Sequence, residues 1–194
     1  GGYAFSDFWD FLKVYEAATE ALQSPEDYHR LTLAVLEESA ASGVIYTETF
    51  LSPDFCGGRD LGAWREYLHA IREAADIAEK NMGIVLRGIV TPIRHFGPDK
   101  ARETAICAAE TAGDWIVGFG LAGDEKIGKP KDFRWSFDAA REAGLEVQIN
   151  TTFTRQNLCE FDDFVRLLVE IRPALWSVFQ LVPTGRGKVD DLLT

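Results

Sequence analysis

The sequence predicts an α/β protein whose parallel strands form a partial (β/α) barrel with flanking helices. Short apolar runs rich in β-branched residues, typical of parallel strands covered on both faces, alternate with longer runs of helical period. Roughly 25 to 40 residues separate the apolar runs, a spacing that fits strand–helix units. A closed eight-stranded barrel needs about 250 residues, and the chain has 194. We therefore expect an open or partial barrel.

Five runs are predicted to be strands because nearly all their side chains are apolar or β-branched. They are Val44–Phe50, Ile84–Thr91, Trp115–Leu121, Val147–Thr151 and Trp176–Val182. No linker or low-complexity tract interrupts the alternation. We expect about five parallel strands in a single α/β domain spanning residues 1–194.

Helix-start and helix-end signals bound the segments between the strands. Ser24-Pro25 is an N-cap followed by a proline at the first helical position, and the helix that begins there runs to Gly43. Asp60 is the expected N-cap of the next helix. The other predicted helices cover residues 5–22, 97–113, 130–144 and 157–171. These signals agree with the strand–helix alternation.

The composition excludes several functional classes. The net charge of −11 disfavours nucleic-acid phosphates as partners. No apolar run reaches about 18 residues, so no segment is expected to span a membrane. Cys56, Cys107 and Cys159 are odd in number and far apart, which disfavours a disulfide framework, a structural zinc or an iron–sulfur cluster. We expect reduced thiols and a cytoplasmic location.

Four stretches of the chain match one known family in order and spacing. They are Ala4–Phe8, Tyr46–Glu48 with Leu51–Pro53, Arg94–His95 and Val117–Glu125, the last ending in Leu-Ala-Gly-Asp-Glu. On these stretches, residues 3–145 resemble the adenosine deaminase family. The resemblance implies a (β/α)₈ barrel that hydrolyses the 6-amino group of adenosine-like purines with a zinc-bound water.

The zinc ligands that the resemblance implies are missing from this sequence. The family takes two ligands from a His-x-His motif, a third from a His-Ala-Gly-Glu stretch, and others later in the chain. Here the histidines are His29, His69 and His95. The first two lie in predicted helices, and His95 matches a family Arg-His pair that does not bind the metal. We therefore expect no metal site and no cofactor, although zinc is expected for the family.

The resemblance does imply a substrate-binding surface. Gly123 matches a glycine whose backbone N–H faces the purine ring. The predicted first helix matches an apolar helix that gates the pocket, with Phe5, Phe8, Trp9 and Leu12 on one side. The implied ligand is a purine nucleoside. No catalytic residue is assigned, because single carboxylates at strand ends, such as Glu48, Asp124 and Glu125, more often bind neighbouring backbone or arginine groups.

Residues 146–187 resemble a different family. The strand Val147–Thr152 and the run Trp176–Gly187 are similar to the later part of a radical SAM domain, a (β/α)₆ partial barrel. That resemblance implies that Asn150, Thr184 and Gly185 contact S-adenosylmethionine, but the CxxxCxxC cluster loop is absent. We therefore interpret the chain as a chimera: residues 1–145 from a deaminase and residues 146–194 from a radical SAM protein. We expect a designed, selected or assembly-derived fragment without catalysis.

Three alternatives remain open from the sequence. The chain could be a binding module for a purine nucleoside or S-adenosylmethionine. It could be a zinc-dependent deaminase if a longer chain or a partner supplies the ligands. It could carry a new metal site near Glu48, His95 and Asp124. In each case the open edges of a five-stranded sheet favour a homo-oligomer, or else the predicted N-terminal helix folded over the opening.

Overall fold

A computed structural model describes residues 5–124, 126–181, 190 and 192. The chain divides into two compact units, Gly1–Leu145 and Glu146–Thr194. The first unit contains a three-stranded sheet and the second a two-stranded sheet. Each unit is described by itself.

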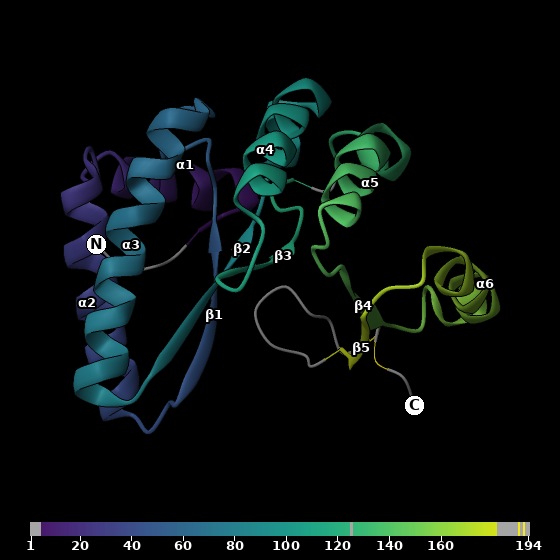
Figure 1. Cartoon of the computed structure of the whole chain (residues 1–194). Coiled ribbons are helices and arrows are strands. Elements are labelled where there is room, and N and C mark those ends of the chain that lie inside the picture. Colours follow the sequence, from purple (N-terminus) through teal and green to yellow (C-terminus); the bar gives the residue numbers. More distant parts are fainter. Residues whose placement is uncertain (1–4, 125, 182–189, 191, 193–194) are drawn as a thin grey trace. The chain divides into compact units, whose positions relative to one another are not determined.

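The sheet of the first unit consists of three parallel strands in the order β1-β2-β3 (Figure 1). The strands are β1 (Tyr46–Leu51), β2 (Val85–Val90) and β3 (Ile116–Phe119). All three lie within the predicted runs or extend them by one residue. The α/β class with parallel strands is therefore confirmed.

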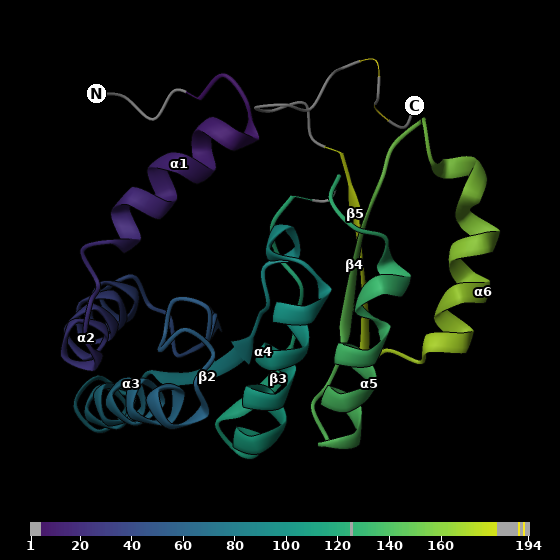
Figure 2. The ribbon, with the colours of Figure 1, turned by 90° about the horizontal axis from the view of Figure 1, so that it is seen from above.

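Helices precede, separate and follow these strands along the chain. They are α1 (Phe8–Thr19), α2 (Pro25–Ala41), α3 (Leu61–Met82), α4 (Pro98–Thr111) and α5 (Arg134–Glu142), with short 3₁₀ turns at Arg94–Phe96 and Pro130–Phe133. Helices α2 and α3 lie side by side (Figure 1), and α3, α4 and α5 follow one another in chain order when seen from above (Figure 2).

Local capping explains where two of these helices begin. The Ser24 hydroxyl accepts a hydrogen bond from the Asp27 N–H, and the Asp27 carboxylate accepts one from the Ser24 N–H, so that α2 starts with a complete capping box. The Asp60 carboxylate accepts from the Ala63 N–H at the start of α3. Both N-caps are those predicted from the sequence.

The core of the first unit lies between the sheet and the helices α3 and α4. Its largest members include Trp64, Ile71 and Ile116, each fully buried. Burying a side chain of this kind contributes about 1.5–3 kcal/mol. Alanines on both helices, including Ala75 and Ala105, are buried as well, so the helices approach the strands closely. The core thus holds the sheet from one side.

The other face of the sheet is open along β1. Its side chains alternate between an exposed set (Tyr46, Glu48 and Phe50) and a more buried set that ends in Leu51. Strand β1 is an edge strand of this sheet. An apolar side chain such as Phe50, which is 71% exposed, is therefore available to a further layer of protein.

The second unit pairs two parallel strands, β4 (Gln148–Phe153) and β5 (Leu175–Gln180), joined through helix α6 (Phe161–Ile171). A 3₁₀ turn at Leu158–Glu160 precedes that helix. The buried ring of Phe153 contacts the rings of Phe161, Phe164 and Trp176. The described residues thus contain five strands, arranged as two sheets. The predicted end of the last strand, Val182, lies outside the described residues.

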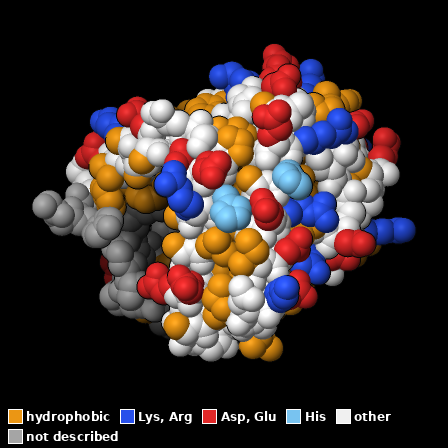
Figure 3. Space-filling view, turned by 60° about the vertical axis from the view of Figure 1, so that its left-hand side comes forward, with side chains coloured by type: hydrophobic (Ala, Val, Ile, Leu, Met, Phe, Trp, Pro, Cys, Tyr) orange, Lys and Arg blue, Asp and Glu red, His pale blue; other side chains and the backbone are white. Residues whose placement is uncertain are grey.

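The surface mixes charges of both signs. Figure 3 shows red acidic and blue basic side chains interspersed across one face, with apolar side chains between them. Of the helices that the structure describes, none is long and apolar enough to cross a membrane.

Candidate functional site

The carboxyl ends of β1, β2 and β3 meet along one edge of their sheet. Leu51 pairs with Val90, and Val90 pairs with Phe119. A further bridge between Ile93 and Ala122 continues the pairing beyond the strands. Because parallel α/β proteins bind their ligands at this edge, the loops that begin here form the candidate site.

The loop from β1 to α3 is built around the buried carboxylate of Asp54, whose side chain is 2% exposed. Arg59 Nη1 donates to its Oδ1 at 2.6 Å, while the hydroxyls of Ser52 (2.9 Å) and Thr104 (3.4 Å) donate to its Oδ2. Arg59 Nε donates to Glu103 at 2.8 Å. The hydrogen bonds to Glu103 and then Asp54 raise the pKa of Arg59. The polar groups of this network are therefore paired with one another.

The backbone of the same loop is equally constrained. Arg59 has a φ of 72°, a left-handed conformation that is uncommon outside glycine. A Cβ on Gly57 would lie 2.6 Å from the Cβ of Ala63, so only glycine fits there. Cys56 is 1% exposed, and burial raises the pKa of its thiol to about 12. The loop is closed, and its cysteine is protonated at neutral pH.

The loop after β2 contains the Arg94-His95 pair. The Arg94 N–H donates to the carbonyl of Ala122 at 2.7 Å, which joins this loop to the one after β3. The Arg94 guanidinium lies 5.4 Å from the centre of the Phe133 ring, a cation–π contact. Arg94 therefore fastens neighbouring segments together.

Gly123, in the loop after β3, packs directly on this pair. Its φ is +102°, and an added Cβ would lie 2.7 Å from His95 Nδ1 and 3.1 Å from the Arg94 nitrogen. Only glycine fits both the backbone conformation and the space. Among the described residues, no hydrogen bond engages the Gly123 N–H. Its contact with a purine remains a prediction that this unpaired donor favours.

His95 leaves a second donor unpaired. Its Nδ1 accepts a hydrogen bond from the Asp124 N–H at 3.4 Å, so in the neutral ring the proton is on Nε2. That Nε2 atom is buried and has no partner among the described residues. Buried donors without a partner are rare and destabilising. Asp124 itself accepts from the Lys126 N–H at 3.0 Å, as a turn-forming side chain does.

Helix α1 contacts these loops through the edges of aromatic rings. Trp9 meets the His95 ring edge-on with 5.5 Å between centroids, and Tyr15 meets Phe55 at 6.3 Å. Leu12 is the buried side chain of α1 within the described residues, whereas Trp9 is 44% exposed. The helix is therefore held lightly against the strand ends.

The remaining predicted gate residues pack within their own segment. The rings of Phe5 and Phe8 both contact Phe11, at 5.5 and 5.9 Å between centroids. Of the four residues predicted to line the pocket, the structure thus brings Trp9 to the strand-end loops and buries Leu12 beneath the helix.

Of the carboxylates considered for acid–base chemistry, Glu48 and Asp124 have ordinary structural partners. Glu48 accepts from the Tyr46 hydroxyl at 2.7 Å, a hydrogen bond that raises the pKa of Tyr46. Glu125 lies outside the described residues. Within the part of the chain that is described, no three side chains of His, Cys, Asp or Glu gather as metal ligands would. The alternative metal site near Glu48, His95 and Asp124 is therefore not formed by these residues.

In the second unit, the residues predicted to contact S-adenosylmethionine are engaged by neighbouring side chains or lie outside the described residues. Asn150 accepts from Gln148 Nε2 at 2.8 Å, and the same nitrogen donates to Ser177 at 3.0 Å. Both bonds lie on the exposed surface of β4 and β5. Thr184 and Gly185 lie outside the described residues.

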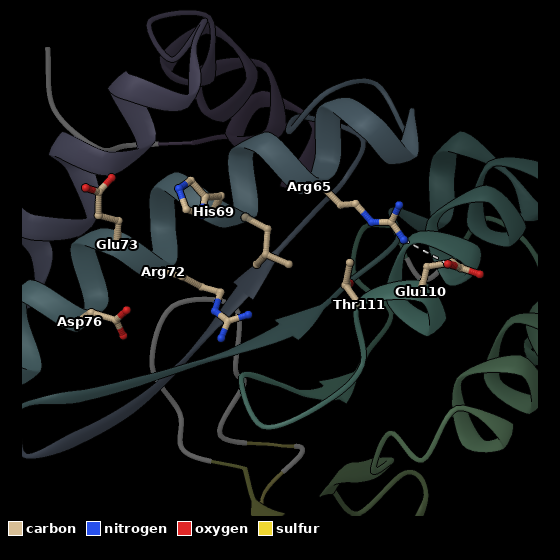
Figure 4. A pocket seen from close by; sticks show the side chains of 8 residues that line it. Arg65, His69, Arg72, Glu73, Asp76, Glu110 and Thr111 are labelled. Carbon is tan, nitrogen blue, oxygen red and sulfur yellow. Dashed lines mark hydrogen bonds and ion pairs between the residues drawn. The ribbon is translucent and has the colours of Figure 1, made fainter.

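A separate hollow of about 580 Å³ lies between α3 and α4. Arg65 reaches across it to Glu110 at 3.1 Å (dashed line in Figure 4). Its remaining lining residues are Leu68, His69, Arg72, Glu73, Asp76 and Thr111. All of them belong to the two helices, so this hollow is distinct from the loops at the strand ends.

The segment that contains these strand ends matches a known protein family. The sequence profile described as "Adenosine deaminase" matches residues 3–152. This is more than half of the chain, which therefore belongs to the adenosine deaminase family. The match includes Gly123, His95 and the β1 loop.

Two relatives show how much of such a protein is present. The adenine deaminase of Chelativorans sp. is 41% identical over 150 residues, which cover 77% of this chain and 46% of the relative. The adenine deaminase of Rhizobium etli is 37% identical over 174 residues, which cover 90% of this chain and 52% of the relative. The chain spans about half the length of the curated relatives it matches.

Solved structures agree on the fold. The adenine deaminase of Arthrobacter aurescens superposes with a TM-score of 0.68 at 29% identity, covering 77% of this chain and 45% of that one. An amidohydrolase from Burkhoderia ambifaria, solved with bound Zn, gives 0.58 at 25% identity, covering 66% and 35%.

The chimera interpretation is wrong. The family match runs through the helix-to-strand joint at residue 145 to residue 152. The Rhizobium etli relative covers 90% of the chain and so extends well beyond that joint. None of these relatives is a radical SAM protein. A short apolar strand with a polar end occurs in many unrelated barrels, so the second resemblance carried little information.

Two further expectations fall with the chimera. The interpretation of the chain as a recombined fragment without catalysis is contradicted, because its relatives are named adenine deaminases at about 40% identity. The expectation that no cofactor is needed is not supported either, since a related amidohydrolase was solved with bound Zn.

Sequence reasoning missed two features of the site. For the Asp54–Arg59–Glu103 network, a signal was available: the two glycines between Asp54 and Arg59 indicate a tight loop. The unpaired Nε2 of His95 had no such signal, because it depends on how the loops after β2 and β3 meet.

Proposed function

We propose that this chain is part of a zinc-dependent purine deaminase that hydrolyses the 6-amino group of adenine or a closely related purine. The observation that carries the proposal is the 41% identity over 150 residues with an enzyme named adenine deaminase. The matched region contains the edge of the sheet at which parallel α/β proteins bind ligands.

In this proposal the chain supplies part of a (β/α) barrel. Strands β1 to β3 are covered by helices on one side, as in a barrel wall. Their other face, where Tyr46, Glu48 and Phe50 are exposed along β1, corresponds to the barrel interior. The rest of the wall would come from the part of a deaminase that this chain does not span.

The residues at hand do not fit the metal. A catalytic zinc needs about three protein ligands and an open position. Within the described residues no such group gathers, and His95 Nδ1 is engaged by the Asp124 N–H. We therefore assign the zinc ligands and the group that moves the proton of the attacking water to the remainder of the enzyme.

The contribution of this chain is recognition of the purine ring. The Gly123 N–H, which is unpaired among the described residues, would donate to a ring nitrogen, as the family resemblance implies. Helix α1 would cover the ring, with Trp9 against the strand ends, Leu12 beneath, and Phe5 and Phe8 farther along. Adenine is the first candidate substrate, because the relatives at about 40% identity are named adenine deaminases.

A hybrid enzyme tests the proposal. Residues 3–152 replace the matched 150 residues of the Chelativorans adenine deaminase, which keeps its own remaining sequence. We expect zinc-dependent release of ammonia from adenine, faster than from adenosine, and abolished by a chelator. A folded, zinc-loaded hybrid that releases no ammonia from either purine would contradict the proposal. The native Chelativorans enzyme is the control.

A further inference from the structure

Three buried side-chain polar atoms of the described residues lack a hydrogen-bond partner: His95 Nε2, Trp115 Nε1 and Ser136 Oγ. Trp115 precedes β3 at its amino end, and Ser136 lies in α5. Of the three, His95 alone lies at the carboxyl edge of the sheet, where a ligand is expected.

The His95 ring is held firmly in place. Its Nδ1 accepts from the Asp124 N–H, and its faces and edges meet Phe96 at 4.8 Å and Trp9 at 5.5 Å between centroids. Gly123 packs so closely that an added Cβ would lie 2.7 Å from Nδ1. The ring therefore cannot turn to satisfy Nε2 without losing these contacts.

Two unpaired donors thus lie in neighbouring loops. The Gly123 N–H and the His95 Nε2–H belong to loops that pack on one another. A purine ring carries several nitrogen acceptors around its edge, so one ring can accept hydrogen bonds from more than one donor. Because an unpaired buried donor destabilises the folded protein, a ligand that accepts from it gains the hydrogen bond and removes that cost.

We propose that His95 is a specificity-determining residue of the purine site, whose Nε2–H donates a hydrogen bond to an acceptor nitrogen of the bound ring. This inference rests on the proposed function and adds a second donor to Gly123. Trp9 meets the His95 ring edge-on. It is 44% exposed and sits on a helix whose buried side chain is Leu12, so it can move aside without disturbing the main core.

A matched pair of variants separates this role from a structural one. In His95→Asn the side-chain oxygen can replace Nδ1 and accept from the Asp124 N–H, but the Nε2 donor is lost. In His95→Gln the amide nitrogen can replace the Nε2 donor, but the acceptor for Asp124 is lost. If His95 Nε2 donates to the purine, adenine should bind about tenfold more weakly to His95→Asn and less than about threefold more weakly to His95→Gln. A purely structural role predicts the reverse order.

The experiment is a titration of the full chain with adenine, followed by ¹⁵N NMR of the His95 ring and the Gly123 amide. Deaza-adenines that lack N1, N3 or N7 are titrated in parallel. We expect both signals to shift with adenine. One deaza analogue should bind native protein about tenfold more weakly, yet bind His95→Asn as adenine does.

The outcomes distinguish the two proposals. If the Gly123 amide shifts and His95 Nε2 does not, the role of His95 is wrong and the purine site stands. If neither responds at millimolar adenine while the chain is folded, the purine site itself is overturned, and His95 with it. Equal losses with all deaza analogues in native protein and in His95→Asn also overturn the inference.

Discussion

The loop that follows β1 and the two loops that follow β2 and β3 start from the same edge of one sheet but treat their polar groups differently. In the first, the buried Asp54 carboxylate accepts from Arg59, Ser52 and Thr104. In the others, the His95 Nε2–H and the Gly123 N–H have no partner among the described residues. The polar groups of the first loop are paired with one another, whereas the other two loops each keep a donor unpaired that a bound purine would accept from under the proposed function.

The difference indicates that the loops at the strand ends have different roles, one in folding and the others in ligand binding. A buried charge that is paired and hydrogen-bonded fixes the shape of a loop. A buried donor without a partner is kept at a cost in stability, and binding sites are where such a cost is compensated. We therefore expect substitutions in the β1 loop to act mainly on folding, and substitutions in the other loops to act mainly on ligand binding.

The largest effect is expected for Asp54→Ala. Removing a buried carboxylate leaves Arg59, which is 19% exposed, without its buried partner. We expect the free energy of unfolding to fall by about 3 kcal/mol, measured by urea denaturation. The matched control is Glu103→Ala. Its carboxylate binds the same arginine but is 57% exposed, so the loss should stay below about 1 kcal/mol. Equal losses would contradict the view that burial of the Asp54 network fixes the loop.

A smaller effect is expected for Gly123→Ala, with Gly43→Ala as its control. Both glycines have positive φ, +102° and +87°, but a Cβ on Gly43 meets nothing within 4 Å. Gly43→Ala should therefore cost about 1 kcal/mol of backbone strain. Gly123→Ala should cost about 2 kcal/mol, because the added methyl group also displaces the His95 ring. Thermal unfolding measures both.

Adenine binding gives a second comparison of Gly123→Ala with Gly43→Ala. Adenine affinity should fall in Gly123→Ala, since the substitution disturbs both unpaired donors, and stay unchanged in Gly43→Ala. Identical stability losses in the two variants, or equal adenine affinity, would contradict the close packing of Gly123 on His95 that the structure shows.

The sequence was sufficient for the α/β class and the parallel strands, because the signals that specify them are local, but it did not predict that the strands form two separate sheets. The caps of α2 and α3 join residues only three positions apart, Ser24 with Asp27 and Asp60 with Ala63. The site was harder, because its bonds are distant in sequence. Arg59 and Glu103 are 44 residues apart, and His95 and Asp124 are 29 apart. No periodicity or cap reports such pairs.

Self-association is the next prediction, because β1 is an edge strand with which a second copy of the chain could pair. We propose a homo-oligomer formed along the edge strand β1, on which Phe50 is 71% exposed and which Ile45, 76% exposed, directly precedes. Phe50→Lys should weaken association by about tenfold, measured by sedimentation velocity over a range of concentrations. Thr47→Lys, on the less exposed set of β1, is the position control. A native chain that is monomeric at every concentration would contradict the proposal.

The smallest effect is expected for the hydrogen-bonded pair of Tyr46 and Glu48 on the exposed face of β1. It tests whether a polar group stabilises the fold because it is paired or because it is buried. The hydrogen bond to Glu48 raises the pKa of Tyr46. Because the protonated hydroxyl is the form that donates, this bond persists below the ordinary tyrosine pKa of about 10 and is lost as the pH rises through the raised value. Glu48→Gln should lower the tyrosinate titration midpoint of Tyr46 towards its ordinary value.

The same variant should leave the free energy of unfolding at neutral pH within about 0.5 kcal/mol, because Tyr46 is half exposed and its bond is in contact with water. Tyr46→Phe assigns the titration among the five tyrosines. A loss in Glu48→Gln as large as that in Asp54→Ala would show that pairing alone stabilises β1 and its loop. The contrast between a buried network and open donors would then no longer explain the two kinds of strand end.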